Sequence, residues 1–350
     1  MMKALSNKPF KVVALSDKNK ESLINSASGG AFMALARPVI ENGGVVFGCV
    51  LDSDGNCYHK SARTYEELKP MQGSKYVRSN VKNTYEECYK CLSENIKVLY
   101  SGTPCQIAGL NSYLEKKKLS AKNLKNLITV DVFCLGTPSA KLFNLYLKWL
   151  SEKHAHGNKI ENLNFRSKVK GWGSNIMSYQ YTHKSKTYKK YLYSWEDPYY
   201  NAFVHNKIMM QQCYKCKYKS KKRCSDFSIG DYWGIESAHP DFYQEHKNDG
   251  VSAVLVNTEK ALRYFNEKVV DNVCYINSTY EKAKQQTIAN DILNDYKENI
   301  EFNTKLDTSI QNGDYLEIFD SLLKAPKKKI VKKRIRILVS KIKRFTANTK

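Results

Sequence analysis

Four cysteines are placed along the chain so that their thiols could hold one metal centre. Cys213 and Cys216 form a Cys-x-x-Cys pair with basic neighbours, and two thiolates at this spacing can bind one centre from a single turn of chain. A tetrahedral zinc ion or a cubane iron–sulfur cluster usually takes four protein ligands, so two more are needed. Cys105 and Cys134 each come at the end of a predicted buried strand. Because such ends converge on the ligand-binding crevice of an open α/β sheet, we expect the four thiols to meet there.

The chain has ten cysteines, and the other six need a separate explanation. Cys88 and Cys91 form a second Cys-x-x-Cys pair, but they lie inside a predicted helix over residues 84–95, and we expect them to fill the core. The two pairs lie more than a hundred residues apart, whereas zinc ribbons use a spacing of ~15–20 residues. Zinc is therefore the weaker alternative to iron.

The remaining cysteines lie outside both pairs. Three of them occur in strand-like runs and are expected as buried thiols: Cys49, Cys57 and Cys274. Cys224 follows Cys216 closely enough in the sequence to approach the same centre. Its role stays open at this point.

The elements that position these residues follow an α/β pattern. Between residues 24 and 156, short β-rich runs alternate with helical stretches. Strands over 97–101 and 127–134 each run into a Gly-Thr-Pro turn and then a helix, and a Ser-Gly-Gly turn precedes a helix over 31–41. Capping boxes at Thr64-x-x-Glu67 and Thr84-x-x-Glu87 predict two short helices.

Alternating aromatic and β-branched residues over 157–195 predict a small antiparallel sheet, followed by a helix over 197–210 and an irregular cysteine-bearing loop over 211–235. We expect an α/β fold with a mixed sheet core flanked by helices, a smaller antiparallel β region and a helical C-terminal part. The expected divisions are an α/β N-terminal domain (1–156), a β-rich cysteine-bearing domain (157–265), a helical extension (266–325) and a basic amphipathic tail (326–350).

The charge of the chain is strongly basic. There are 57 Lys and Arg against 34 Asp and Glu, a formal charge of +23, and residues 327–350 carry eleven of the basic residues and no acid. An apolar stripe on this tail has helical spacing: Val331, Ile335, Leu338, Ile342 and Phe345. Two interpretations stay open, an interfacial helix on an anionic membrane surface and docking onto the body or a partner.

No segment approaches the ~18 consecutive apolar residues of a membrane span, and the N-terminus lacks a secretory signal. We expect a cytoplasmic protein in which thiols stay reduced, and the basic tail allows a peripheral position at the inner face of the membrane. The histidines show no metal-ligand spacing. Tyrosines and lysines mix over 179–200, but this composition is more typical of a solvated β surface than of a nucleic-acid binder. We expect no nucleic-acid partner.

Five short segments, over roughly residues 20–265, carry a resemblance to a known family. They are Ser-Ala-Ser-Gly-Gly (26–30), Gln-Gly-Ser-Lys-Tyr-Val (72–77), Ser-Gly-Thr-Pro-Cys-Gln-Ile-Ala-Gly-Leu (101–110), Val-Phe-Cys (132–134) and the segment from Cys-Tyr-Lys-Cys to Ile-Gly-Asp-Tyr-Trp-Gly (213–234). In this order they resemble the coenzyme F420 hydrogenase/dehydrogenase beta-subunit family.

The resemblance implies a protein that binds FAD and one 4Fe-4S cluster, with the α/β domain over 1–156 as the flavin- and cluster-binding domain. The implied cluster ligands are Cys105, Cys134, Cys213 and Cys216. The implied flavin-site residues are Ser26, Ser28, Gly29, Gly30, Lys75, Tyr76, Thr103 and Asp231. A Gly-Gly turn that opens a helix lets a phosphate approach backbone N–H groups, which is consistent with this assignment.

The function that follows is an oxidoreductase that moves electrons between a hydride donor, FAD and the cluster. The hydride donor would be the deazaflavin coenzyme or NAD(P)H. Many family members begin with a ferredoxin-like Cys-x-x-Cys-x-x-Cys-x-x-x-Cys-Pro run that this chain lacks, so a separate redox partner such as ferredoxin is expected. The alternative is a non-enzymatic or degenerate accessory protein of surface-polysaccharide biosynthesis at the membrane.

Overall fold

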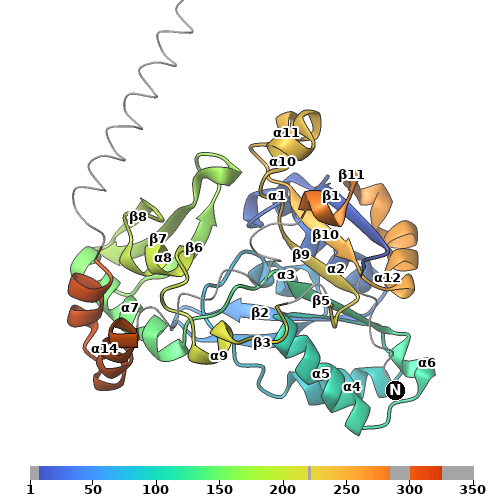
Figure 1. Cartoon of the computed structure of the whole chain (residues 1–350), viewed down its shortest axis with the longest axis horizontal. Helices are drawn as coiled ribbons and strands as arrows, with labels where there is room; N and C mark the ends of the chain where they lie inside the picture. Colours follow the sequence, from blue (N-terminus) through green and yellow to red (C-terminus); the bar gives the residue numbers. More distant parts are fainter. Residues whose placement is uncertain (1–7, 220–221, 284–299, 325–350) are drawn as a thin grey trace, which may run out of the picture.

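The computed structural model describes residues 8–219, 222–283 and 300–324 (Figure 1). Its centre is an eight-stranded mixed sheet with the order β11-β1-β10-β9-β5-β4-β2-β3. The strands are β1 (Lys11–Asp17), β2 (Val45–Leu51), β3 (Cys57–Ala62), β4 (Val98–Gly102), β5 (Leu127–Val132), β9 (Phe227–Asp231), β10 (Ser252–Val256) and β11 (Val273–Ser278). Strands β2, β4, β5 and β9 pair in parallel, whereas β3, β10 and β11 run antiparallel to their neighbours.

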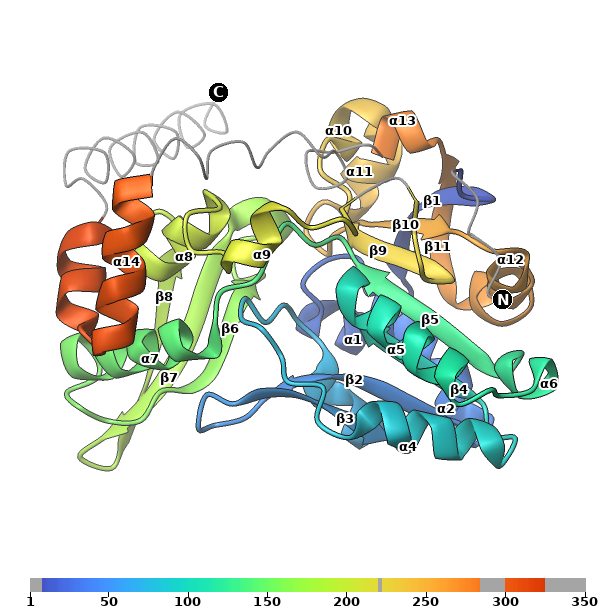
Figure 2. The ribbon, with the colours of Figure 1, turned by 60° about the horizontal axis from the view of Figure 1, so that its bottom comes forward.

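Helices cover both faces of this sheet. On one face, α2 (Ala31–Glu41), α12 (Glu259–Tyr264) and the π-helical turn η3 (Phe265–Val269) bury apolar side chains of the sheet. On the other face, α4 (Thr84–Ser93) and α5 (Pro104–Lys116) lie side by side (Figure 2). Cys88 and Cys91 belong to α4 and are buried in the core between this helix, α5 and the sheet, as expected.

A second layer lies beside the large sheet (Figure 1). It is a three-stranded antiparallel sheet of β6 (Glu161–Ser167), β7 (Ile176–His183) and β8 (Lys186–Tyr193). Around it pack α7 (Ala140–His154), α8 (Pro198–Val204), α14 (Ile300–Asn312) and η6 (Glu317–Leu322), which share a largely aromatic core with the sheet. Tyr146 and Tyr199 stack in this core with ring centroids 4.5 Å apart.

The remaining helices are short. They are α1 (Lys20–Asn25), α3 (Tyr65–Leu68), η1 (Lys69–Met71), α6 (Ala121–Leu124), η2 (Trp172–Ser174), α9 (Gln211–Tyr214), α10 (Ile235–Ala238), α11 (Pro240–His246), η4 (Val270–Asn272) and α13 (Tyr280–Ala283). None of the helices in the described part of the chain combines the length and apolar character that crossing a membrane requires.

The expected fold class is confirmed, since a mixed sheet with flanking helices, a small antiparallel sheet and C-terminal helices are all present. The large sheet, however, runs across the division expected at residues 156 and 157, because β9, β10 and β11 pair with strands of the N-terminal part. The basic tail over 326–350, including its apolar stripe, lies outside the described residues.

Three local expectations need correction. Residues 211–235 are not wholly irregular, because they contain the central strand β9. The helix expected over 197–210 ends at Val204. Thr84 does not cap its helix: the N-cap is Asn83, and the Thr84 hydroxyl donates to the Val81 carbonyl oxygen at 2.6 Å instead. The capping box at Thr64 does form.

Candidate functional site

A cavity of about 470 Å³ opens where the parallel strands β4, β5 and β9 end. Its lining includes the turn before α2, Cys49 of β2 and His59 of β3, the loop over 71–79, and the segments that follow these three strands. The smaller layer adds Arg166, Tyr200 and Phe203. Ligand sites in open α/β sheets form at the carboxyl ends of strands, so the position agrees with the expectation from sequence. Seven predicted flavin-site residues line it: Ser26, Ser28, Gly30, Lys75, Tyr76, Thr103 and Asp231.

The two adjacent glycines of the turn have different surroundings. Gly30 is the N-cap of α2 and has φ +80°, a left-handed conformation that glycine adopts without strain. Gly29 is not among the residues that line the cavity. A Cβ atom at Gly29 would lie 2.2 Å from the Leu15 carbonyl oxygen and 2.6 Å from the Ser252 nitrogen. Gly29 therefore lets the turn pack against β1 and β10, and Gly30 faces the cavity.

Two hydroxyls on the same turn are held by hydrogen bonds. The Gln72 amide donates to Ser26 Oγ at 3.1 Å, and Ser28 Oγ donates to the Val251 carbonyl oxygen at 2.7 Å. These contacts tie the turn to the loop over 71–79 on one side and to the start of β10 on the other. The cavity wall is therefore built before any ligand binds.

The loop over 71–79 contributes one cation and one aromatic ring. Lys75 is half-buried, and its ammonium donates to the carbonyl oxygens of Pro70 at 2.9 Å and Gln72 at 2.6 Å. The ring of Tyr76 stacks on Phe203, with centroids 3.9 Å apart. The loop thus places a positive charge and a flat apolar surface on the same wall.

Asp231 lies at the end of β9 and is already paired. Arg166 donates to its carboxylate through two nitrogens, at 2.8 and 3.1 Å, and the Trp172 indole N–H donates to it at 2.7 Å. The Arg166 guanidinium also lies over the Trp233 ring, 5.1 Å from its centroid. Asp231 therefore orients Arg166 at the cavity wall.

A buried histidine that the sequence did not single out lies at the same wall. His59 Nε2 donates to the Ser101 carbonyl oxygen at 3.0 Å, and the Ser79 hydroxyl donates to His59 Nδ1 at 3.1 Å. The Gln106 amide donates to Ser79 Oγ at 2.9 Å, and the Thr103 hydroxyl donates to Gln106 Oε1 at 3.0 Å. Burial lowers the pKa of His59 to about 4, so the ring is neutral at physiological pH.

Cys105 lies in the first turn of α5, directly after Pro104. Its sulfur accepts a hydrogen bond from Arg78 Nη1 at 3.1 Å and lies 3.2 Å from the Thr103 hydroxyl oxygen. A helix N-terminus and a neighbouring guanidinium both interact favourably with negative charge, which a metal-bound sulfur carries. Thr103 thus connects the Cys105 sulfur to the hydrogen-bond chain that ends at His59.

Two of the other predicted cluster ligands, Cys134 and Cys213, lie near Cys105, and the third, Cys216, lies near Lys219. Cys134 follows β5 and lines the cavity, and burial, reinforced by the charges of Cys213 and Cys105, raises its pKa to about 12. Lys219 faces the group: burial lowers its pKa, and the charges of Cys134, Cys213 and Cys216 oppose that shift. All four thiols are therefore within electrostatic range of a cation, Arg78 or Lys219.

Within the described residues, no group of three or more His, Cys, Asp or Glu side chains is placed so that it could hold a metal ion. A 4Fe-4S cluster takes four thiolates and is larger than a single ion, so its ligands lie farther apart. The donor set of four thiols facing two cations fits such a cluster in its chemistry, because cations offset the negative charge of thiolate ligands.

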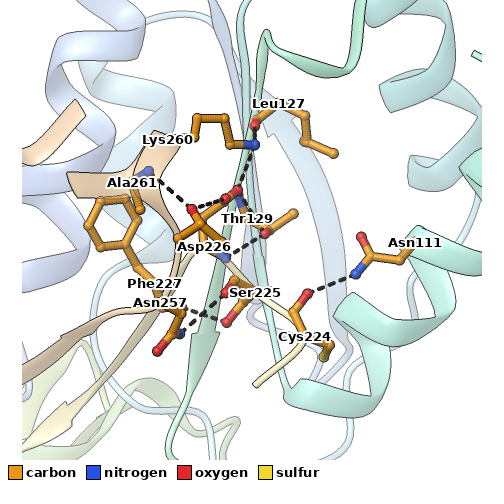
Figure 3. Close-up of polar contacts among 11 residues, drawn as sticks. Asn111, Leu127, Thr129, Cys224, Ser225, Asp226, Phe227, Asn257, Lys260 and Ala261 are labelled. Atoms are coloured by element: carbon orange, nitrogen blue, oxygen red, sulfur yellow. Dashed lines mark hydrogen bonds and ion pairs between the residues drawn. The ribbon is translucent and has the colours of Figure 1, made fainter. Parts of the chain in front are cut away.

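Cys224 contacts the first turn and the middle of α5 (Figure 3). Its thiol donates to the Pro104 carbonyl oxygen at 3.2 Å, and the Asn111 amide donates to the Cys224 carbonyl oxygen at 2.8 Å. Burial raises the pKa of Cys224 to about 12. These contacts fix the segment that enters β9 against the helix that bears Cys105.

Asp226 is a structural residue at the start of β9 (Figure 3). Its carboxylate accepts hydrogen bonds from the Thr129 nitrogen at 2.9 Å and from the Thr258 hydroxyl at 2.8 Å, and it pairs with Lys260 at 2.9 Å. It thereby joins β5, β9 and the start of α12, which holds the cysteine-bearing segment in register with the sheet.

Several residues of this site were not predicted from the sequence. Two of them adjoin segments that it did single out: Arg78 directly follows the Gln72–Val77 motif, and Gln106 belongs to the Pro-Cys-Gln segment. His59 and Lys219 gave no such signal, because their position depends on contacts that the chain makes only when folded.

Comparison with known proteins places these features in a family. The family model that describes the C terminus of the coenzyme F420 hydrogenase/dehydrogenase beta subunit matches residues 96–303, more than half of the chain. The comparison with curated proteins finds no match.

Among solved structures, a chain of the F420-reducing [NiFe] hydrogenase complex from Methanosarcina barkeri superposes with a TM-score of 0.51 at 21% sequence identity. The match covers 86% of this chain and 92% of that chain, and it shows that the two share a fold. On the family match, this protein belongs to the coenzyme F420 hydrogenase/dehydrogenase beta-subunit family.

Proposed function

We propose that this protein is a flavin- and iron–sulfur-dependent oxidoreductase subunit that moves electrons between a hydride donor, FAD and a 4Fe-4S cluster. Membership of a family of hydrogenase and dehydrogenase subunits supports an oxidoreductase role in general. The observation that carries the finer proposal is the cavity of about 470 Å³, whose lining includes both the predicted flavin-site residues and Cys134. One site would therefore bring the two redox groups together.

The cavity wall fits a flavin nucleotide in its chemistry. The turn that ends at Gly30 and the charge of Lys75 suit a phosphate group, and the stacked rings of Tyr76 and Phe203 suit a flat aromatic ring. The Thr137 hydroxyl is buried at the cavity with no hydrogen-bond partner among the described residues, so a ligand can supply one. FAD would provide both two-electron and one-electron chemistry.

Cys105, Cys134, Cys213 and Cys216 would hold the cluster, which accepts one electron at a time. Arg78 and Lys219 would offset the negative charge of the bound thiolates. The protein itself would then hold the negatively charged cluster away from water and next to the flavin pocket.

A hydride donor, the deazaflavin coenzyme or NAD(P)H, would supply electrons in pairs, and a partner such as ferredoxin would take or give them singly. The similar solved chain comes from a hydrogenase complex, which supports a redox partner protein. We further propose a cytoplasmic position, with residues 327–350 as the contact to an anionic membrane surface.

The test is the absorbance spectrum of anaerobically purified protein together with its iron and flavin content. We expect about four irons and about one FAD per chain. Zinc in place of iron, or failure to bind FAD after the cluster is reconstituted, would overturn the proposal and favour the accessory-protein alternative.

A further inference from the structure

A second pair of thiols lies at the same cavity, apart from the four proposed cluster ligands. Cys49 in β2 and Cys57 in β3 occupy the same face of the sheet, and their sulfur atoms are 3.2 Å apart. The S–S bond of a disulfide is about 2.05 Å long, so closing the pair requires a movement of about 1 Å. Side-chain rotation of two cysteines on neighbouring strands covers such a distance.

The two thiols differ in exposure. Cys49 is half-buried and lines the cavity, whereas Cys57 is only 7% exposed and is not among the lining residues. The turn between the strands is fixed by the Asp52 nitrogen, which donates to the Asn56 carbonyl oxygen at 3.0 Å. A reaction partner therefore reaches Cys49 through the cavity, and Cys57 lies behind it.

The surroundings also give the two thiols different proton affinities. The hydrogen bond from Cys57 lowers the pKa of Cys49, against burial, and the charge of Lys75 and the hydroxyl of Ser79 lower it further. The same hydrogen bond and burial raise the pKa of Cys57. Cys49 is therefore the first to become a thiolate, the reactive form, and Cys57 keeps its proton.

We propose that Cys49 and Cys57 form a redox-active dithiol that exchanges an electron pair with the flavin bound in this cavity. In the oxidative direction both S–H bonds break, one S–S bond forms, and two electrons and two protons pass to the flavin, which is thereby reduced. In the opposite direction the reduced flavin returns them and the disulfide opens. This inference rests on the proposed function, because it takes the flavin as its reaction partner.

The dithiol would add a two-electron store to the site. A dithiol releases electrons in pairs, whereas an iron–sulfur cluster carries one at a time. A protein with this pair could accept a second hydride before a one-electron partner has removed the first two electrons.

The experiment is an anaerobic reductive titration of oxidised holoprotein whose FAD content is measured first. We compare wild type with Cys49→Ser and Cys57→Ala, and we use Cys274→Ser, a half-buried cysteine of β11 outside the cavity, as the matched control. Wild type and the control should each take up about two electrons per chain more than either cavity variant. If Cys57→Ala does not fold, as judged by circular dichroism, Cys49→Ser decides alone.

Peptide mapping gives a readout that does not depend on activity. A protease that cleaves before aspartate cuts the chain at Asp52 and Asp54, between the two cysteines, so only a disulfide keeps the two fragments together. We expect joined fragments in oxidised holoprotein and separate fragments after reduction. In protein stripped of FAD, the disulfide should form about ten times more slowly, because no acceptor is held beside Cys49.

The outcomes are distinguishable. Absence of bound FAD overturns the proposed function and this inference with it. Bound FAD with equal electron counts in all four proteins, or with fragments that always separate, overturns the dithiol alone. Equal rates of disulfide formation with and without FAD would show that the oxidant comes from solution. This result would also overturn the proposed electron exchange between the dithiol and the flavin.

Discussion

Arg78 donates a hydrogen bond to the Cys105 sulfur, with Nη1 3.1 Å from Sγ. Arg78 belongs to the same loop as Lys75 and Tyr76, both of which line the cavity. One loop therefore serves both the proposed flavin pocket and the proposed cluster, so a change in this loop should affect both.

Replacing Arg78 should weaken cluster retention. Arg78→Gln removes the positive charge beside Cys105, and outer-shell partners of metal ligands are worth about tenfold or more in metal affinity. We expect iron to pass to a chelator about ten times faster than from wild type, with Arg78→Lys intermediate because it keeps the charge but loses the fork of donors. Equal rates in the three proteins would contradict a role for Arg78.

The four proposed ligands should control iron content. Serine at Cys105, Cys134, Cys213 or Cys216 should remove most of the iron, because serine is a poor substitute for a thiolate. Serine at Cys88, which is fully buried on the core side of α4, should leave the iron in place. Iron and acid-labile sulfide assays measure this, and full retention in the Cys213→Ser/Cys216→Ser double variant would disprove the assignment.

Alanine substitutions at the two adjacent glycines, Gly29 and Gly30, should have different effects. At Gly29, alanine would collide with the backbone of β1 and β10, so we expect a loss of about 3 kcal/mol in the free energy of unfolding. At Gly30, alanine must adopt φ +80° and its Cβ atom would lie 2.8 Å from the Cβ atom of Asp17, so we expect a loss of about 2 kcal/mol together with weaker FAD binding, because Gly30 lines the cavity.

Gly173→Ala is the matched control for this pair, because a Cβ atom there meets nothing within 4 Å. Urea unfolding and flavin titration distinguish the three variants. If Gly29→Ala proved as stable as Gly173→Ala, the packing role of Gly29 would be wrong.

Removing one partner of the ion pair between Arg166 and Asp231 should lower the free energy of unfolding more than replacing both partners with apolar residues. The side chains are 5% and 18% exposed, so Asp231→Asn leaves a buried guanidinium without an anion and should cost about 3 kcal/mol. The double variant Arg166→Met/Asp231→Leu should recover much of this loss in urea unfolding. A double variant less stable than Asp231→Asn would show that the pair itself stabilises the fold.

His59 should make stability depend on pH. Burial lowers its pKa from 6.5 to about 4, so between these values the unfolded chain binds a proton that the folded chain does not. Stability therefore falls as the pH drops from about 6.5 towards about 4, by about 3 kcal/mol in all. His59→Gln should lack this contribution, and its unfolding free energy relative to wild type should change with pH only in that window. A difference in unfolding free energy between the two proteins that does not change with pH would contradict this prediction.

The strands and helices that carry Cys105 and Cys134 could be predicted because local patterns determine them. The runs over 97–101 and 127–134 are apolar enough to be strands in any buried setting, and Gly-Thr-Pro then begins a helix or a loop. The bounds of the helix Ala31–Glu41 could be predicted because Gly30 precedes its first residue and Asn42 follows its last, and both residue types are common at helix ends.

Strand β9 could not be predicted in the same way. Its sequence, Phe-Ser-Ile-Gly-Asp, has the turn-forming residues of a loop, and it becomes a strand because β5 and β10 supply hydrogen bonds on both sides. A long-range contact also decides which glycine lines the cavity. Gly29 packs against Ser252, more than two hundred residues away, and Gly30 lines the cavity. Long-range contacts of this kind leave no local pattern.

The order of strands in the large sheet also bears on how the chain folds during synthesis. Strand β1 pairs only with β10 and β11, whose residues lie more than two hundred positions later, and β9 must insert between β5 and β10. Until the ribosome has made these late strands, the edges of β1 and β5 are unpaired and open to aggregation. Truncations before residue 278 should therefore misfold, and chaperone binding to the nascent chain should persist until β11 has emerged.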